Sequence, residues 1–108
     1  MPNSNIVIQP ESSLDVNSSE ALRREIVDTI GREPDTILVD CQAITFMDSS
    51  GLSALVMALK LSKEKGIRFA LCSVGEQANM LFQLTGMDQV FDMFENRAAF
   101  EATIAQPA

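Results

Sequence analysis

The pattern of apolar and polar positions predicts strands that alternate with helices along the chain. Short apolar runs rich in β-branched residues favour strands, and longer segments with apolar positions at i and i+4 favour amphipathic helices. The strands are expected at residues 6–8, 36–41, 67–73 and 90–94, and the helices at 18–31, 50–65, 75–85 and 98–104. This alternation predicts right-handed crossovers in an α/β fold, with a mostly parallel sheet of about four strands and about four helices.

Residues that begin or end helices punctuate this pattern. Asn17, with a glutamate three residues later, is typical of a capping pair at the start of the first helix. Gly31, Gly66 and Gly86 are placed to end the first three helices. Residues 11–15 are polar and predict a turn ahead of the first helix.

The most distinctive stretch is the junction at residues 37–52. A buried strand is followed by a short apolar patch at 44–47, and then Asp48-Ser49-Ser50-Gly51 opens a helix. Aspartate and serine cap helix starts because their side-chain oxygens accept hydrogen bonds from the free N–H groups of the first turn. Open α/β sheets also place their sites at the ends of strands. Two interpretations therefore remain open, a helix cap alone or a functional site.

Composition restricts the class of protein. At 108 residues and 46% hydrophobic content, the chain fits one soluble domain. No apolar run approaches the roughly 20 residues of a membrane span, and the first residues do not resemble a secretory signal, so a cytoplasmic protein is expected. The net charge of −7 argues against nucleic acid as a partner. The basic pair Arg23-Arg24 is interpreted as part of a solvated helix face.

The residue types present also limit catalysis. The chain has no histidine, which excludes Ser-His-Asp and Cys-His sites built from this chain alone. Cys41 and Cys72 lack zinc-ligand spacing and are expected to be buried free thiols. Asp15, Asp40 and Asp48 could in principle hold a metal ion, but no phosphate-binding group accompanies them. The chain is therefore expected not to be an enzyme, with no metal and no cofactor.

After these exclusions, the remaining candidate for a functional residue is a serine that can be modified. A phosphoryl group on Ser49 or Ser50 would add about −1.5 to −2 charge. The start of a helix tolerates this charge because its free N–H groups and its dipole favour an anion. Next to Asp48 the same charge makes the surface much more negative, which weakens a complex while the domain stays folded. The position therefore suits a reversible binding switch better than catalysis.

Residues 46–52, Phe-Met-Asp-Ser-Ser-Gly-Leu, closely resemble the signature of the anti-sigma factor antagonists of the STAS domain family. The resemblance covers roughly residues 6–104 and implies one STAS domain over residues 1–108. Further matching segments are Leu14-Asp15, Gly66 ahead of the strand at 69–72, residues 81–87 and the strand at 90–94.

The resemblance implies a function and a set of site residues. In the bacterial members, an anti-sigma factor that is itself a serine kinase phosphorylates the first serine after the aspartate, and a PP2C-type phosphatase reverses the modification. By position, Ser49 is the phosphoacceptor. The unphosphorylated form binds the kinase and releases the sigma factor. Asp15 and Asp48 are expected to shape the contact site. The docking helix is expected to begin with Ser50, Gly51 and Leu52, where the glycine allows a partner to approach closely.

Two departures from the family pattern bear on these expectations. The family's first N-terminal strand is short or missing here, so one sheet edge is expected to be exposed, which makes a homodimer a possibility. The glycine usual before the Leu-Asp turn is replaced around Ser12, which affects the shape of the Asp15 loop. Two other functions remain open: a non-catalytic adaptor subunit of a lipid-transport or signalling assembly, and a nucleotide-binding protein that uses Asp15 and Asp48.

Overall fold

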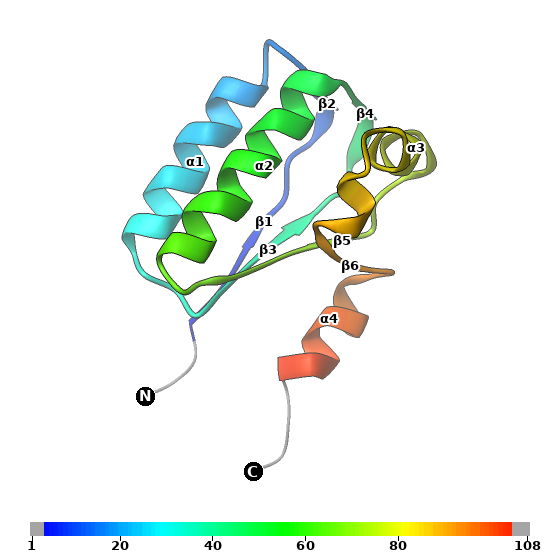
Figure 1. The fold of residues 1–108 in the computed structure, drawn as a ribbon. Helices are drawn as coiled ribbons and strands as arrows, with labels where there is room; N and C mark the ends of the chain where they lie inside the picture. The colour runs from blue at the N-terminus through cyan, green and yellow to red at the C-terminus, as the bar shows by residue number, and fades with distance from the viewer. Residues whose placement is uncertain (1–3, 105–108) are drawn as a thin grey trace.

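A computed structural model describes residues 4–104 (Figure 1). It contains each predicted strand and helix, and the predicted α/β fold with a four-stranded parallel sheet is confirmed. In chain order the elements are β1 (Asn5–Ile8), β2 (Ser12–Leu14), α1 (Ser19–Gly31), β3 (Thr36–Asp40), β4 (Ile44–Met47), α2 (Ser49–Glu64), β5 (Arg68–Cys72), α3 (Glu76–Thr85), the 3₁₀ turn η1 (Met87–Gln89), β6 (Asp92–Phe94) and α4 (Arg97–Ile104).

The main sheet has the strand order β1-β3-β5-β6, and all its neighbouring strands are parallel. Because this order advances in one direction, right-handed crossovers place α1, α2 and α3 on the same face, and α4 packs on the other (Figure 1). Alternate residues of the central strands therefore serve two separate cores. Ile37, Val39, Phe69 and Leu71 face the three crossover helices, whereas Leu38, Ala70 and Cys72 meet Phe100 of α4.

A second, two-stranded parallel sheet forms from β2 and β4. The sequence predicts a turn at 11–15, and there the prediction is wrong, because Ser12–Leu14 pairs with Ile44–Met47. Both strands are short and only partly buried, so their local pattern carries little information. The pairing holds the two segments that precede α1 and α2 side by side.

The helix boundaries differ from the sequence prediction at α1. Its N-cap is Ser18 and not Asn17, and the Ser18 side chain makes no capping hydrogen bond. Gly31 is the last residue of α1, where the sequence predicts the helix to end, and the residue in the left-handed conformation after it is Glu33, with φ 53°. Gly66 and Gly86, with φ of 71° and 76°, follow α2 and α3 as predicted.

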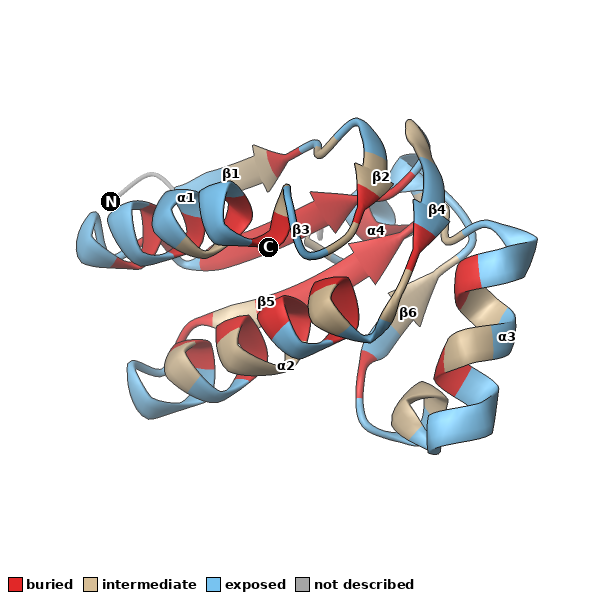
Figure 2. Cartoon of the chain, turned by 90° about the horizontal axis from the view of Figure 1, so that it is seen from above, coloured by how far each residue is buried: buried red, intermediate tan, exposed pale blue. Residues whose placement is uncertain are grey.

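Some apolar residues of the helices lie at the surface, where the helices carry exposed positions (Figure 2). Val27 of α1 and both Met80 and Leu84 of α3 are exposed, with Leu84 at 81%. Helix α3 reaches the core mainly through Ala78 and Phe82. The apolar faces of α1 and α3 are therefore narrower than their composition predicts.

The exposed sheet edge expected from the sequence belongs to β1. In the described part of the chain, β1 pairs with β3 only, and no strand precedes it. The homodimer remains a prediction. The sequence also predicts loose chain ends at residues 1–4 and 106–108, and these residues, apart from Ser4, lie outside the described part of the chain. No helix among the described residues is long and apolar enough to cross a membrane.

Candidate functional site

The site lies where β2 and β4 end together. Leu14 and Met47 are partners in the parallel register, and the Asp48 N–H donates to the Leu14 carbonyl at 3.2 Å. The next residues, Asp15 and Asp48, therefore emerge at the same end of the small sheet. The structure thus brings together two aspartates that are far apart in sequence.

Asp48 caps α2 as predicted. Its Oδ1 accepts hydrogen bonds from the Ser50 N–H at 2.8 Å and the Gly51 N–H at 3.2 Å. These bonds satisfy two of the free N–H groups of the first helical turn. Ser49, the first residue of α2, is exposed, and Ser50 is half-buried. The hydroxyl-bearing residue predicted to be modified is thus at the surface.

Asp15 orders the start of α1. Its Oδ1 accepts from the Asn17 N–H at 2.9 Å and the Ser18 N–H at 3.3 Å. The Ser18 hydroxyl donates to the Ser13 carbonyl at 2.6 Å, which ties the turn back to β2. Asp15 therefore fixes the start of α1, and Asp48 fixes the start of α2. The two helix starts lie side by side.

Gly51 does not open a path for a partner, contrary to the expectation from the sequence. It is buried, and a Cβ placed there would collide with the Leu14 carbonyl oxygen and lie 2.7 Å from Leu14 Cγ. Leu52 is only 6% exposed and belongs to the main core. These two residues support the site from beneath, whereas Asp15, Asp48, Ser49 and Ser50 are accessible.

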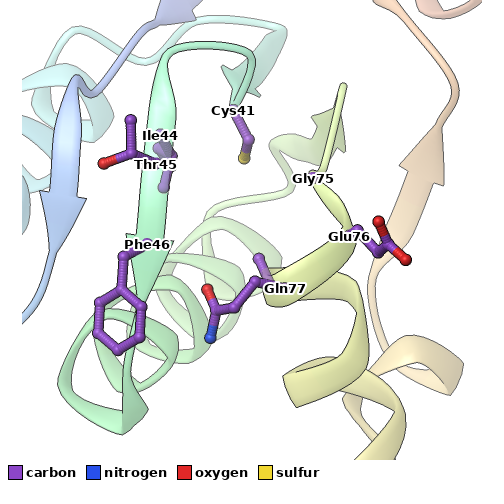
Figure 3. Close-up of a pocket in the computed structure, with 8 residues that line it drawn as sticks. Cys41, Ile44, Thr45, Phe46, Gly75, Glu76 and Gln77 are labelled. Carbon is purple, nitrogen blue, oxygen red and sulfur yellow. The ribbon is translucent and has the colours of Figure 1, made fainter.

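Gln77 is a site residue that the sequence did not identify. From α3 its side chain extends toward β4 (Figure 3). There, Oε1 accepts from the Met47 N–H at 2.8 Å, and Nε2 donates to the Met47 carbonyl at 2.9 Å. Beside this pair is a hollow of about 210 Å³ between β4 and α3, lined in part by Thr45 and Phe46. No local signal marks Gln77, because its partner is 30 residues away.

Arg23 is a second residue of this kind. Its Nη2 donates to the Ser53 hydroxyl at 3.2 Å, and its Nη1 lies 3.3 Å from the Met57 sulfur. The side chain thus bridges from α1 to α2 and is half-buried, whereas the sequence places Arg23 on a solvated face. The neighbouring Arg24 is exposed, as predicted.

The two thiols are buried and unsuited to nucleophilic chemistry. Burial, together with the nearby Cys72 and Asp40, raises the pKa of Cys41 to about 12. Burial and Asp40 also raise the pKa of Cys72. Among residues 4–104, no group of three or more His, Cys, Asp or Glu side chains is placed to hold a metal ion, so the three aspartates considered from the sequence do not form such a site.

Comparison with known proteins decides the family. A family model of the STAS domain matches residues 2–100. The chain belongs to the STAS domain family. The matched residues include the small sheet, the helices α1 and α2, and the core on each face of the main sheet.

Two relatives of similar sequence carry regulatory names. The anti-sigma F factor antagonist of Paenibacillus polymyxa is 26% identical over 92 residues, which cover 84% of this STAS chain and 79% of the relative. The anti-sigma-B factor antagonist of Bacillus subtilis (strain 168) is 27% identical over 88 residues, which cover 82% of this chain and 80% of the relative. The solved structure of the anti-sigma factor antagonist SpoIIAA in its unphosphorylated form shares the fold, with a TM-score of 0.80 and 21% identity. The match covers 100% of this chain and 96% of the SpoIIAA chain.

Proposed function

We propose that this STAS domain is an anti-sigma factor antagonist that is switched by phosphorylation at Ser49. In this proposal the unphosphorylated form binds an anti-sigma factor serine kinase, and the sigma factor is released. The observation that carries the proposal is the exposed Ser49 at the first position of α2, next to the capping carboxylate of Asp48. The names of the relatives from Paenibacillus polymyxa and Bacillus subtilis support the same role.

The chain supplies the acceptor, and its partners supply the catalysis. The kinase brings ATP and a base. The bond between Ser49 Oγ and the γ-phosphorus forms, the bond from that phosphorus to the ADP oxygen breaks, and the hydroxyl proton passes to the base. A PP2C-type phosphatase then hydrolyses the phosphoester with water and regenerates the hydroxyl. The STAS chain acts in both steps as a substrate and not as an enzyme.

Electrostatics explains how the switch separates folding from binding. At the start of α2 the helix dipole favours added negative charge, so the fold accepts the phosphate. The same phosphate stands beside Asp48, close to Asp15, on a chain of net charge −7. A pair of unit charges about 5 Å apart at an effective dielectric constant near 20 interacts by roughly 3 kcal/mol, and solvent exposure lowers this value. The phosphate therefore weakens binding to a partner surface that is acidic or that fits closely around the unmodified serine.

The contact surface we assign consists of Asp15, Asp48, Ser49 and Ser50. All four are exposed or half-buried at the joint end of β2 and β4. Gly51 and Leu52 belong to the same site as its support, because Gly51 lets α2 approach the backbone of β2 and Leu52 anchors the first turn in the core.

A phosphorylation assay tests the proposal. The anti-sigma factor kinase of the same organism is incubated with labelled ATP and the wild-type chain, Ser49→Ala or Ser50→Ala. We expect labelling of the wild type and of Ser50→Ala and none of Ser49→Ala. Equal labelling of Ser49→Ala and wild type overturns the site. Absence of labelling by this kinase, together with co-purification of the chain with a transporter subunit, overturns the switch in favour of an adaptor.

A further inference from the structure

Arg23 reaches across the two helices that lead away from the site. It lies four residues after the first residue of α1, and its partner Ser53 lies four residues after the first residue of α2. The two helices pack against each other and begin at the joined ends of β2 and β4 (Figure 1). Arg23 is therefore level with Ser53, one helical turn away from Ser49.

The guanidinium contacts Ser53 and Met57, which lie about one and two helical turns beyond Ser49 on α2, so it has to turn back by about one turn to reach the site. Residues at i and i+4 share one helix face, so Ser49 and Ser53 lie one above the other on α2. Side chains of a helix lean toward its N-terminus, which for α1 is the end at the site. One turn of helix rises about 5.4 Å. A rotamer change of a long, half-exposed arginine covers such a distance.

We propose that Arg23 is the phosphate-binding residue of the Ser49-phosphorylated form, and that it leaves Ser53 and Met57 to pair with the phosphate. This inference rests on the proposed function, since it concerns the modified state of that site. The exchange is favourable because a hydroxyl and a thioether sulfur are weak acceptors for a guanidinium, whereas a phosphate accepts two charge-assisted hydrogen bonds from it.

The movement of Arg23 also changes a second surface of the domain. Arg23 and Met57 both line two neighbouring hollows on the outer side of α1 and α2, of about 330 and 300 Å³. When Arg23 turns to the phosphate, it leaves Met57 and changes the shape of these hollows. Phosphorylation of Ser49 thereby changes the surface along both helices as well as the charge at their start.

The test uses the full chain with phosphoserine placed at position 49 during synthesis through an expanded genetic code. Phosphorus NMR follows the phosphate as the pH is varied, in the wild type, in Arg23→Gln and in Arg24→Gln. Arg24 is the matched control because it is the next residue of α1 and is exposed. An arginine charge about 4 Å from the phosphate favours the dianion, so we expect Arg23→Gln to raise the second pKa of the phosphate by about 0.7 unit. Arg24→Gln should shift it by less than half as much.

Further variants keep the test decisive. Arg23→Lys keeps the positive charge but loses the bidentate donor. The second pKa of the phosphate in this variant should therefore lie between those of wild type and Arg23→Gln. Ser53→Ala removes the competing acceptor, so its phosphate should titrate at or slightly below the wild-type pKa. If Arg23→Gln does not fold, as judged by circular dichroism, these two variants carry the comparison, and a wild-type value for Arg23→Lys then counts against the proposal.

The outcomes separate this inference from the proposed function. Equal phosphate pKa values in wild type and Arg23→Gln, or equal shifts in the two glutamine variants, overturn the role of Arg23 whatever the kinase does. Because the phosphoserine is introduced without a kinase, a shift confined to Arg23→Gln supports the pairing even if the kinase assay fails. In that case the pairing of Arg23 with the phosphate is supported, and the proposed switch by the kinase is not.

Discussion

The side-chain amide of Gln77 pairs with the backbone of Met47 as a neighbouring strand would, with one hydrogen bond in each direction. This pair closes the outer edge of β4 immediately before Asp48. It also attaches α3 to the segment that carries Ser49. An exposed glutamine on one helix thus fixes the position of the residues that begin another.

Replacing Gln77 should loosen this segment. We expect Gln77→Ala to lower the free energy of unfolding by about 1 kcal/mol, because two hydrogen bonds are lost at a partly exposed place. The Met47 amide should exchange with solvent faster, as measured by hydrogen-exchange NMR. Gln83→Ala, also exposed on α3, is the control and should leave the Met47 amide unchanged. Unchanged exchange in Gln77→Ala would show that the pair does not hold β4 in solution.

Two glycines give a matched pair of alanine substitutions. Gly51→Ala places a Cβ against the Leu14 carbonyl, so α2 must move away from β2. We expect a loss of at least about 2 kcal/mol in the free energy of unfolding, measured in urea. Gly31→Ala has no atom within 4 Å of its Cβ and should stabilise α1 by about 0.5–1 kcal/mol. Equal effects of the two substitutions would contradict the close approach of α2 to β2.

The parts of the fold that depend on local chemistry could be predicted from the sequence. The buried strands β3 and β5 are continuous apolar runs, and Asp48 accepts hydrogen bonds from residues two and three positions later. Such signals lie within a few residues of one another. The alternation of strands and helices then leaves few arrangements other than the observed parallel sheet.

The parts that depend on distant partners could not be predicted. Strand β2 has three residues and begins at Ser12 with a positive φ, so only its pairing with β4 reveals it. The Gln77–Met47 and Arg23–Ser53 contacts each join residues 30 positions apart. The role of Gly51 was predicted wrongly for the same reason, since the atoms of Leu14 that it faces come from another strand.

Ser12 occupies a position that suits glycine. Its φ of 62° lies in the left-handed region, where a side chain costs about 1 kcal/mol, partly offset by the greater freedom of glycine in the unfolded chain. We therefore expect Ser12→Gly to raise the free energy of unfolding by about 0.5 kcal/mol. Ser13→Gly, the next residue of β2, is the control and should lower it. Thermal and urea unfolding check both, and destabilisation by Ser12→Gly would contradict the expected relief of strain.

A charge at Ser49 should separate folding from binding. Ser49→Asp places a carboxylate in the first turn of α2, where the helix dipole favours it by about 0.3–1 kcal/mol, so the variant should unfold no more easily than Ser49→Asn. Its affinity for the anti-sigma factor kinase, measured by calorimetry, should fall about tenfold, equivalent to about 1.4 kcal/mol. Ser49→Asn has nearly the same shape without the charge and should bind close to the wild type. Equal affinities of the two variants would argue against an electrostatic switch.

The buried thiol of Cys41 should make the domain less stable in alkali. Its pKa is near 9 when unperturbed and about 12 in the folded chain, because burial disfavours the thiolate. Between these values the unfolded chain has lost the proton and the folded chain has kept it. The unfolded state then binds fewer protons, so the free energy of unfolding falls as the pH rises, by up to about 1.4 kcal/mol per pH unit for this group.

Cys41→Ala isolates this contribution, because it removes the thiol and leaves the other titrating groups. The variant starts from a lower stability at pH 7, since a small cavity replaces the sulfur, but its stability should fall less steeply above pH 9. Cys72, whose pKa burial also raises, keeps some slope in the variant. Urea unfolding under reducing conditions from pH 7 to pH 10.5 measures both curves. Parallel curves would mean that the folded chain gives up the Cys41 proton as readily as the unfolded chain does.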